Sequence, residues 1–96
     1  MERIRFDELL YVESMQNYVC LQTERGKFTT LLTLKNTLSE LPSNAFMQVH
    51  KSYLVNLEKV QTLGDGHIRI NDKLIPISRS RLQEVTQRIL GNDLIN

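Results

Sequence analysis

Hydrophobic residues recur along the chain in short runs or at every second position, which is the pattern of β-strands. Such runs predict strands at residues 3–6, 9–14, 18–24, 27–31, 46–49, 53–57, 59–63, 67–71 and 74–77. Short turn-forming sequences separate several of them, at Arg25–Gly26, Gly64–Gly66 and Asn71–Lys73. Connections this short imply antiparallel pairing, and Pro76 in the last run favours a position at a sheet edge.

The period becomes helical after residue 33. Three leucines at positions i, i+4 and i+7 predict one face of a short helix: Leu34, Leu38 and Leu41. Thr33 is placed to cap the N-terminus of this helix, and Pro42 is placed to end the segment. The chain then returns to strand-like patterning.

A second helix is predicted over residues 79–90. Its apolar face repeats at helical spacing through Leu82, Val85 and Ile89. Ser78 is placed to cap its N-terminus, and Gly91 is placed to end it. The order is therefore strands, a short helix, more strands and a closing helix, which indicates a mainly β domain with antiparallel sheets.

Composition is typical of a small globular domain. The 96 residues are 41% hydrophobic and 24% charged, and a domain of this size buries roughly 60–70% of its unfolded surface. No apolar run is long enough to span a bilayer, and the N-terminal sequence lacks the apolar stretch of a secretory signal. The single cysteine, Cys20, is expected to be a packed thiol in an intracellular, reducing compartment.

Charge is unevenly distributed although the net charge is only +1. Residues 1–24 hold two arginines against five acids, a net of −3, so the remainder carries +4. Residues 67–81 hold four basic residues against Asp72 alone. This modest basic segment makes an anionic partner plausible.

The start of the predicted C-terminal helix breaks a local electrostatic rule. Helix N-termini favour acids, at about 0.3–1 kcal/mol per group. Here Arg79 and Arg81 occupy the expected first turn, and no acid follows until Glu84. A phosphate would meet free backbone N–H groups, two guanidinium groups and the hydroxyls of Ser78 and Ser80. The alternative is that both arginines point into solvent at a small cost.

The stretch from Val49 to Asn56 places three polar residues inside a strand-like run. The alternation of apolar positions slips across residues 50–53, which indicates a bend, bulge or turn. Lys51 would project there and could reach a phosphate or a base edge. His50 and Ser52 also have structural interpretations, as a hydrogen-bonding residue beside the bend and as a turn cap.

A second polar interruption lies at residues 13–18, between two apolar strands. The amide side chains of Gln16 and Asn17 have the hydrogen-bonding groups that read adenine in a major groove. The alternative is a hairpin turn without further role.

Catalytic and metal-binding motifs are missing from the sequence. It contains no nucleophile elbow, no glycine-rich phosphate loop, no HExxH and no zinc-type Cys/His spacing. We therefore expect a protein that is not an enzyme and that needs no cofactor or metal.

Four stretches, in order, match a known family: "DELLYVES", a Leu-rich helix, "FMQVHKSYLVNLEKV" and "IPISRSRLQEV". They resemble the LytTR family, the DNA-binding domain of LytR/AgrA-type bacterial response regulators. The most specific part is F-x-x-V-H-x-S-Y-x-V-N, with I-P-x-S-R in register behind it. The resemblance indicates one domain over residues 1–96 with a core over about 4–90.

The resemblance implies a mainly β fold, with short antiparallel strands in small stacked sheets, one short internal helix and a C-terminal helix. It also implies that loops, not a recognition helix, enter successive major grooves of duplex DNA. Matching positions assign base contacts to Asn17 and Tyr18, to Lys51 beside His50, and to Arg79. They assign backbone contacts to Ser14, Gln16, Ser80 and Arg81.

The same resemblance implies a cellular context. The family carries this domain behind a receiver domain in two-component systems of the bacterial cytoplasm, where it binds paired promoter sites. We expect the 96 residues to be part of a longer protein, and the isolated domain to be monomeric or weakly dimeric. Two alternatives stay open: a small β module that docks an acidic protein, and a regulator fused to membrane helices outside this sequence. Whether His50 touches DNA or only shapes its loop is also open, and we favour the second.

Overall fold

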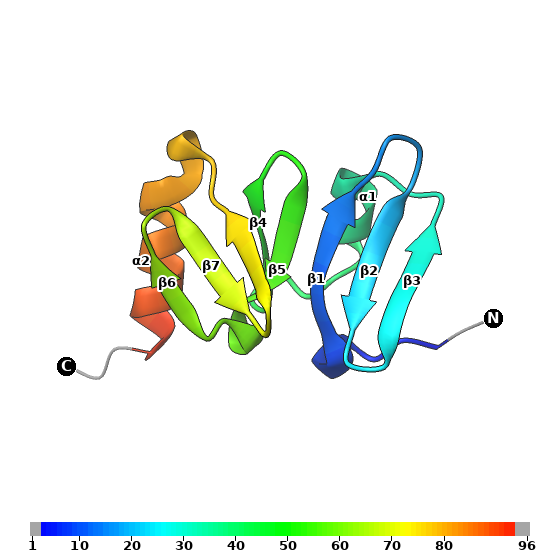
Figure 1. Cartoon of the computed structure of the whole chain (residues 1–96), viewed down its shortest axis with the longest axis horizontal. Helices are drawn as coiled ribbons and strands as arrows, with labels where there is room; N and C mark the ends of the chain where they lie inside the picture. The colour runs from blue at the N-terminus through cyan, green and yellow to red at the C-terminus, as the bar shows by residue number, and fades with distance from the viewer. Residues whose placement is uncertain (1–2, 94–96) are drawn as a thin grey trace.

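The computed structural model describes residues 3–93 and contains two antiparallel sheets and two α-helices (Figure 1). The larger sheet has the order β3-β2-β1-β5-β4. Its strands are β1 Leu9–Ser14, β2 Val19–Thr23, β3 Gly26–Thr30, β4 Phe46–His50 and β5 Tyr53–Asn56. The smaller sheet runs β6-β7-β8, with β6 Thr62–Gly64, β7 His67–Ile70 and β8 Lys73–Pro76. The helices are α1 Leu34–Ser39 and α2 Leu82–Asp93.

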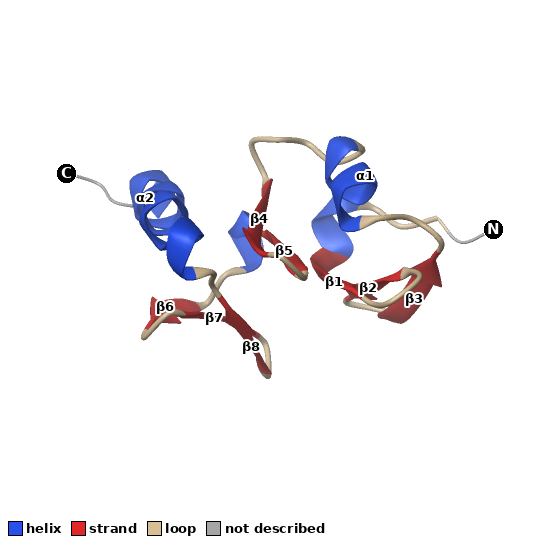
Figure 2. Cartoon of the chain, turned by 90° about the horizontal axis from the view of Figure 1, so that it is seen from above, coloured by secondary structure: helices blue, strands red, loops and turns tan. Residues whose placement is uncertain are grey.

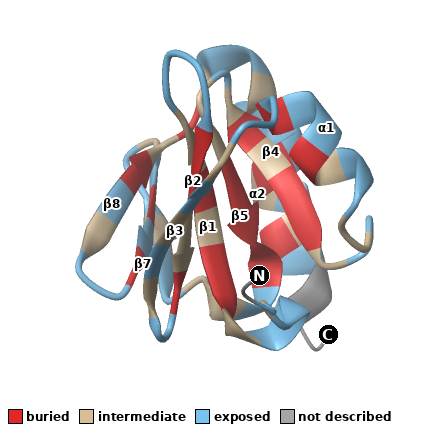
Figure 3. Ribbon diagram, turned by 90° about the vertical axis from the view of Figure 1, so that its right-hand side faces the viewer, coloured by how far each residue is buried: buried red, intermediate tan, exposed pale blue. Residues whose placement is uncertain are grey.

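Strand alternation divides the core into two clusters on opposite faces of the larger sheet. On β1, Leu9 joins the cluster around α1, whereas Leu10 joins the cluster that contains the smaller sheet and α2. Val12 returns to the α1 cluster because a register shift between Leu9 and Tyr11 interrupts the alternation. On β5, Leu54 and Val55 divide in the same way. Both faces of the central strands are therefore buried, as Figure 3 shows. Each fully buried aliphatic side chain of this kind contributes about 1.5–3 kcal/mol.

The helices share one side of the molecule. Seen from above, α1 and α2 lie on one side, while β1–β3 and β6–β8 form the other (Figure 2). Val85 and Ile89 anchor α2 in the core with the smaller sheet. Within residues 3–93, no helix combines the length and the apolar character needed to cross a bilayer.

Most of the predicted architecture is confirmed. The fold is mainly β and antiparallel, with one short internal helix and one C-terminal helix. The Thr33 side chain accepts a 3.0 Å hydrogen bond from the backbone N–H of Asn36 and so caps α1. β8, which contains Pro76, is an edge strand. The β6–β7 turn has positive φ at both central residues, Asp65 and Gly66, as a two-residue hairpin requires.

One predicted strand is wrong and another is confirmed only in part. Residues 3–5 are irregular and Phe6–Glu8 form a 3₁₀ turn, because contacts within the segment provide hydrogen bonds that do not require a neighbouring strand. The Arg5 backbone N–H donates to the Glu8 carboxylate at 3.1 Å, and its guanidinium pairs with Asp7. Of the strand predicted over 59–63, only Thr62 and Leu63 are in β6. A 3₁₀ turn at Leu57–Lys59 comes first, because the side chain of Asn56 accepts from the N–H of Glu58.

The ends of the C-terminal helix also differ from the prediction. The α-helix begins at Leu82, after a 3₁₀ turn at Arg79–Arg81, and the Ser78 side chain makes no capping hydrogen bond. Gly91 does not end the helix, which continues to Asp93. A glycine costs only about 1 kcal/mol inside a helix, so it lowers stability there without forcing a stop.

Candidate functional site

Three polar segments that are distant in sequence meet along one edge of the molecule. They are the β1–β2 loop, the β4–β5 turn and the segment before α2, which we together call the loop edge: residues 14–18, 50–52 and 78–81. In Figure 1 they follow one another along the upper edge, parallel to the longest dimension of the molecule, which is 44 Å. The sheets therefore bring together all nine residues that the sequence singled out.

Backbone hydrogen bonds hold the outer two segments to the central turn and to the end of β4. The N–H of Ser14 donates to the carbonyl oxygen of Ser52 at 2.7 Å. The N–H of Ser78 donates to the carbonyl oxygen of Val49 at 2.9 Å. The central turn is therefore held on both sides, which fixes the spacing of the outer two segments.

The central turn follows a slip in strand register. β4 and β5 pair with a register shift between Gln48 and His50, as the phase slip in the sequence predicts. The His50 ring nitrogen Nδ1 accepts a 3.1 Å hydrogen bond from the backbone N–H of Ser52. The same ring packs edge-on against Tyr53, with centroids 5.8 Å apart. His50 thus closes the turn from inside, and Lys51 at its tip is exposed.

The two arginines in the segment before α2 have different surroundings. The Arg81 N–H donates to the Ser78 carbonyl oxygen at 2.9 Å, and Arg81 Nη1 donates to the Ser78 hydroxyl at 3.3 Å. Arg81 is half-buried and lines a hollow together with residues of α2 and β4. Arg79 and Ser80 are exposed. Within residues 3–93, the Arg79 guanidinium has no hydrogen-bond or ion-pair partner, so it is available to an external acceptor.

The β1–β2 loop is closed by a backbone hydrogen bond. The N–H of Met15 donates to the carbonyl oxygen of Tyr18 at 2.8 Å, and the Ser14 hydroxyl donates to the carbonyl oxygen of Met15. Gln16 and Asn17 stand exposed at its tip. The loop is a hairpin turn, as the simpler interpretation expected, and it also presents both amides outward.

A polar cluster beneath the loop edge connects the two sheets. The Tyr53 hydroxyl donates to the Glu13 carboxylate at 3.0 Å, and Lys73 Nζ lies 5.5 Å from the centre of the Tyr53 ring. Burial opposes the charge on Lys73, yet hydrogen bonding to Tyr53 and the nearby Glu13 carboxylate together raise its pKa. Burial also raises the pKa of Tyr11, whose ring lies 6.4 Å from that of Tyr53.

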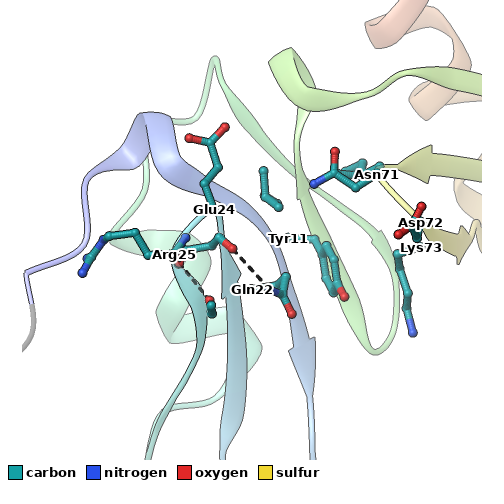
Figure 4. Close-up of a pocket in the computed structure, with 11 residues that line it drawn as sticks. Tyr11, Gln22, Glu24, Arg25, Asn71, Asp72 and Lys73 are labelled. Atoms are coloured by element: carbon teal, nitrogen blue, oxygen red, sulfur yellow. Dashed lines mark hydrogen bonds between the residues drawn. The ribbon is translucent and has the colours of Figure 1, made fainter.

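A separate cleft of about 680 Å³ lies at the other ends of the strands. Figure 4 shows Tyr11 between Gln22 and the turn at Asn71–Lys73, with Glu24 and Arg25 beyond. These side chains come from β1, β2 and β8 and from the β2–β3 and β7–β8 turns, and both turns lie away from the loop edge. Within residues 3–93, no group of three or more His, Cys, Asp or Glu side chains is placed to hold a metal ion.

The fold and the loop edge define a class of small β domain that presents exposed polar residues on connected loops. A family model described as the LytTr DNA-binding domain matches residues 1–90, and the chain belongs to this family. The family named by the sequence motifs is therefore confirmed.

Individual relatives agree with this assignment. An uncharacterized response regulatory protein of Vibrio cholerae is 30% identical over 86 residues, which are 80% of this chain and 33% of that protein. The transcriptional regulatory protein YpdB of Escherichia coli K12 is 25% identical over 88 residues, 84% of this chain and 36% of that protein. The chain thus spans about a third of the length of these curated relatives.

A solved structure shares the fold. The LytTr DNA-binding domain of a response regulator from Bacillus cereus superposes with a TM-score of 0.78 at 19% sequence identity. The match covers 92% of this chain and 85% of the other. The two-sheet arrangement with a C-terminal helix is therefore that of a LytTr domain.

Proposed function

We propose that this domain binds specific sequences in duplex DNA through the loop edge, as the output domain of a bacterial transcriptional regulator in the cytoplasm. The observation that carries the proposal is that backbone hydrogen bonds hold three loops with exposed polar residues along one edge of the molecule. We infer that the outer two loops enter successive major grooves, which recur about every 34 Å along one face of B-DNA.

The exposed side chains suit different parts of this contact. Arg79 has a free guanidinium fork, which matches the two acceptors on the major-groove edge of guanine. Asn17 and Gln16 carry amides that suit adenine, with Tyr18 beside them. Lys51, midway along the edge, contacts a base or a phosphate. His50 holds the Lys51 turn and does not itself read a base.

Hydroxyl groups near these side chains are placed for the DNA backbone. Ser14 and Ser80 flank the outer contacts and suit phosphate oxygens. Arg81 is half-buried and tied to Ser78, so its role is to hold the Arg79 segment and add positive charge near a phosphate.

The curated relatives are about three times as long as the part of them that this chain matches. The additional length is relevant to the cellular role. Their names describe response regulation and transcriptional regulation. We infer a receiver domain in the longer protein, paired promoter sites as targets, and a monomeric or weakly dimeric isolated domain. No catalysis, cofactor or metal is needed for this function.

Selection of bound sequences from a random duplex pool tests the proposal. Fluorescence anisotropy would then measure the affinity of the domain for the selected duplex and for a scrambled duplex at a series of salt concentrations. We expect a selected site, tighter binding to it, and affinity that falls steeply with salt because counterions are released from phosphates. A weak response at low salt that ignores sequence would instead favour the module that docks an acidic protein.

A further inference from the structure

A hollow of about 280 Å³ lies at one end of the loop edge, between the β1–β2 loop and the chain that joins β3 to α1. We call it the end hollow. Its lining comes from these two segments and includes Met15, Gln16, Asn17, Tyr18, Leu31 and Leu32. The sequence pattern did not suggest it, because two segments 13 or more residues apart in the chain build it.

The end hollow gathers large apolar side chains that the core leaves exposed. Four of the eight exposed large hydrophobic residues among residues 3–93 line it, so the apolar surface is concentrated here. They are Leu31 at 84% exposure, Leu32 at 41%, Met15 at 39% and Tyr18 at 38%. Grouped apolar side chains on a small domain usually mark a contact surface.

The surroundings of the end hollow favour DNA as the molecule that covers it. The amides of Gln16 and Asn17 share its lining, so any duplex that they read also covers the leucines. Neither lining segment contains an acidic residue, and Lys35 beside them is exposed. A surface without carboxylates tolerates the phosphate field of a duplex, whereas a nearby acid would repel it.

We propose that Leu31 and Leu32 contact thymine C5-methyl groups in the major groove beside the Asn17 loop. The thymine methyl is the apolar group that the major groove displays, and it marks an A·T pair as clearly as the adenine amide does. The end hollow therefore extends the readout with an apolar contact next to two amides. This inference rests on the proposed DNA interface and assigns specificity to residues outside the nine already named.

Removing single methyl groups from the DNA tests this contact. Each thymine of the duplex that the wild-type domain selects is replaced in turn by deoxyuridine, which deletes only the C5-methyl. Binding is measured by anisotropy for the wild-type domain, for the double variant Leu31→Ala with Leu32→Ala, and for Leu74→Ala. Leu74 is 50% exposed on β8 and does not line the end hollow, so it is a matched control.

We expect one or two deoxyuridine positions to weaken wild-type binding by about 4-fold each, the effect of leaving one methyl group in water. The double variant should bind the thymine duplex as weakly as the wild-type domain binds the deoxyuridine duplex. Replacing thymine by deoxyuridine at those positions should then cause no further loss. Leu74→Ala should behave as wild type. Circular dichroism would confirm that the variants fold, as exposed leucines allow.

Two results would overturn the inference while the DNA interface stands. One is a selected site at which no deoxyuridine weakens wild-type binding. The other is a double variant whose affinity, compared with that of the wild-type domain on the same duplex, falls by the same factor for thymine and deoxyuridine duplexes. The wild-type leucines would then contact sugars or a second protein molecule. Failure of the wild-type domain to select any sequence would overturn both this inference and the proposed DNA interface. The selection experiment comes before any variant is made, so this failure is distinguished from the two results above.

Discussion

The backbone N–H of Ser14 donates a 2.7 Å hydrogen bond to the carbonyl oxygen of Ser52. These residues begin one loop and end another, 38 positions apart in the chain. Since neither partner is a side chain, the connection is independent of side-chain rotamers. It fixes the β1–β2 loop relative to the Lys51 turn, which is what a multi-point contact with a rigid duplex requires.

Arg79 should be the most sequence-sensitive contact. Arg79→Ala should lose roughly 1–3 kcal/mol of discrimination for the selected duplex, and Arg79→Lys should recover little, since a lysine lacks the planar fork. Anisotropy against selected and scrambled duplexes measures both losses. Arg69→Ala on β7 is the charge-matched control, with a small loss on both duplexes. Full recovery by Arg79→Lys would instead indicate a phosphate contact.

Lys51 contacts a phosphate or a base, and the two differ in salt dependence. If it contacts a phosphate, Lys51→Ala should weaken binding to all sequences alike and reduce the salt slope by about one unit. If it reads a base, the loss should concentrate on the selected duplex. The control is Lys27→Ala, an exposed lysine on edge strand β3. No change for Lys51→Ala in either measurement would remove Lys51 from the interface.

His50 should act by shaping its turn. An asparagine side chain can accept a hydrogen bond from the backbone N–H two residues on, as His50 Nδ1 does from Ser52. His50→Asn should therefore keep most of the DNA affinity, whereas His50→Ala should lose several-fold because the Lys51 turn loosens. Equal losses for both variants, in a domain of unchanged stability, would mean that the imidazole itself contacts DNA.

Asn56 should matter for stability rather than recognition. It is buried, its Nδ2 donates to the carbonyl oxygen of Leu9 at 2.9 Å, and its Oδ1 accepts from the N–H of Glu58. Asn56→Ala leaves these backbone groups without partners and should lower the free energy of unfolding by roughly 1–3 kcal/mol. Urea denaturation measures this, with the exposed Asn36→Ala as control. A change of a few tenths of a kcal/mol would show that water replaces the amide.

The candidate site could be predicted where the sequence departs from the regular pattern of a strand or a helix. The phase slip around His50 and the arginines before α2 marked the loop edge because each violates a local rule that the fold otherwise obeys. The segment at residues 3–6 was misread because its alternation is a strand pattern, while the ion pair of Arg5 with Asp7 and the contact with Glu8 favour a turn. A local pattern does not weigh such competing side-chain contacts.

Contacts between distant segments could not be predicted from the sequence. Strand order in the larger sheet decides that Ser14 meets Ser52, and the packing of the smaller sheet beside the larger one decides that Ser78 meets Val49. No local pattern encodes either arrangement. The end hollow was missed for the same reason. Leu31 and Leu32 looked like the end of a strand and the approach to a helix, and only the folded chain places them beside Asn17.

Hydroxyl-radical footprinting of the wild-type domain on its selected duplex tests the central claim most directly. If the loop edge lies along the duplex, one face should show two protected segments about one helical turn apart, close to 10 base pairs. A single short protected segment, or uniform protection that does not depend on sequence, would contradict the account.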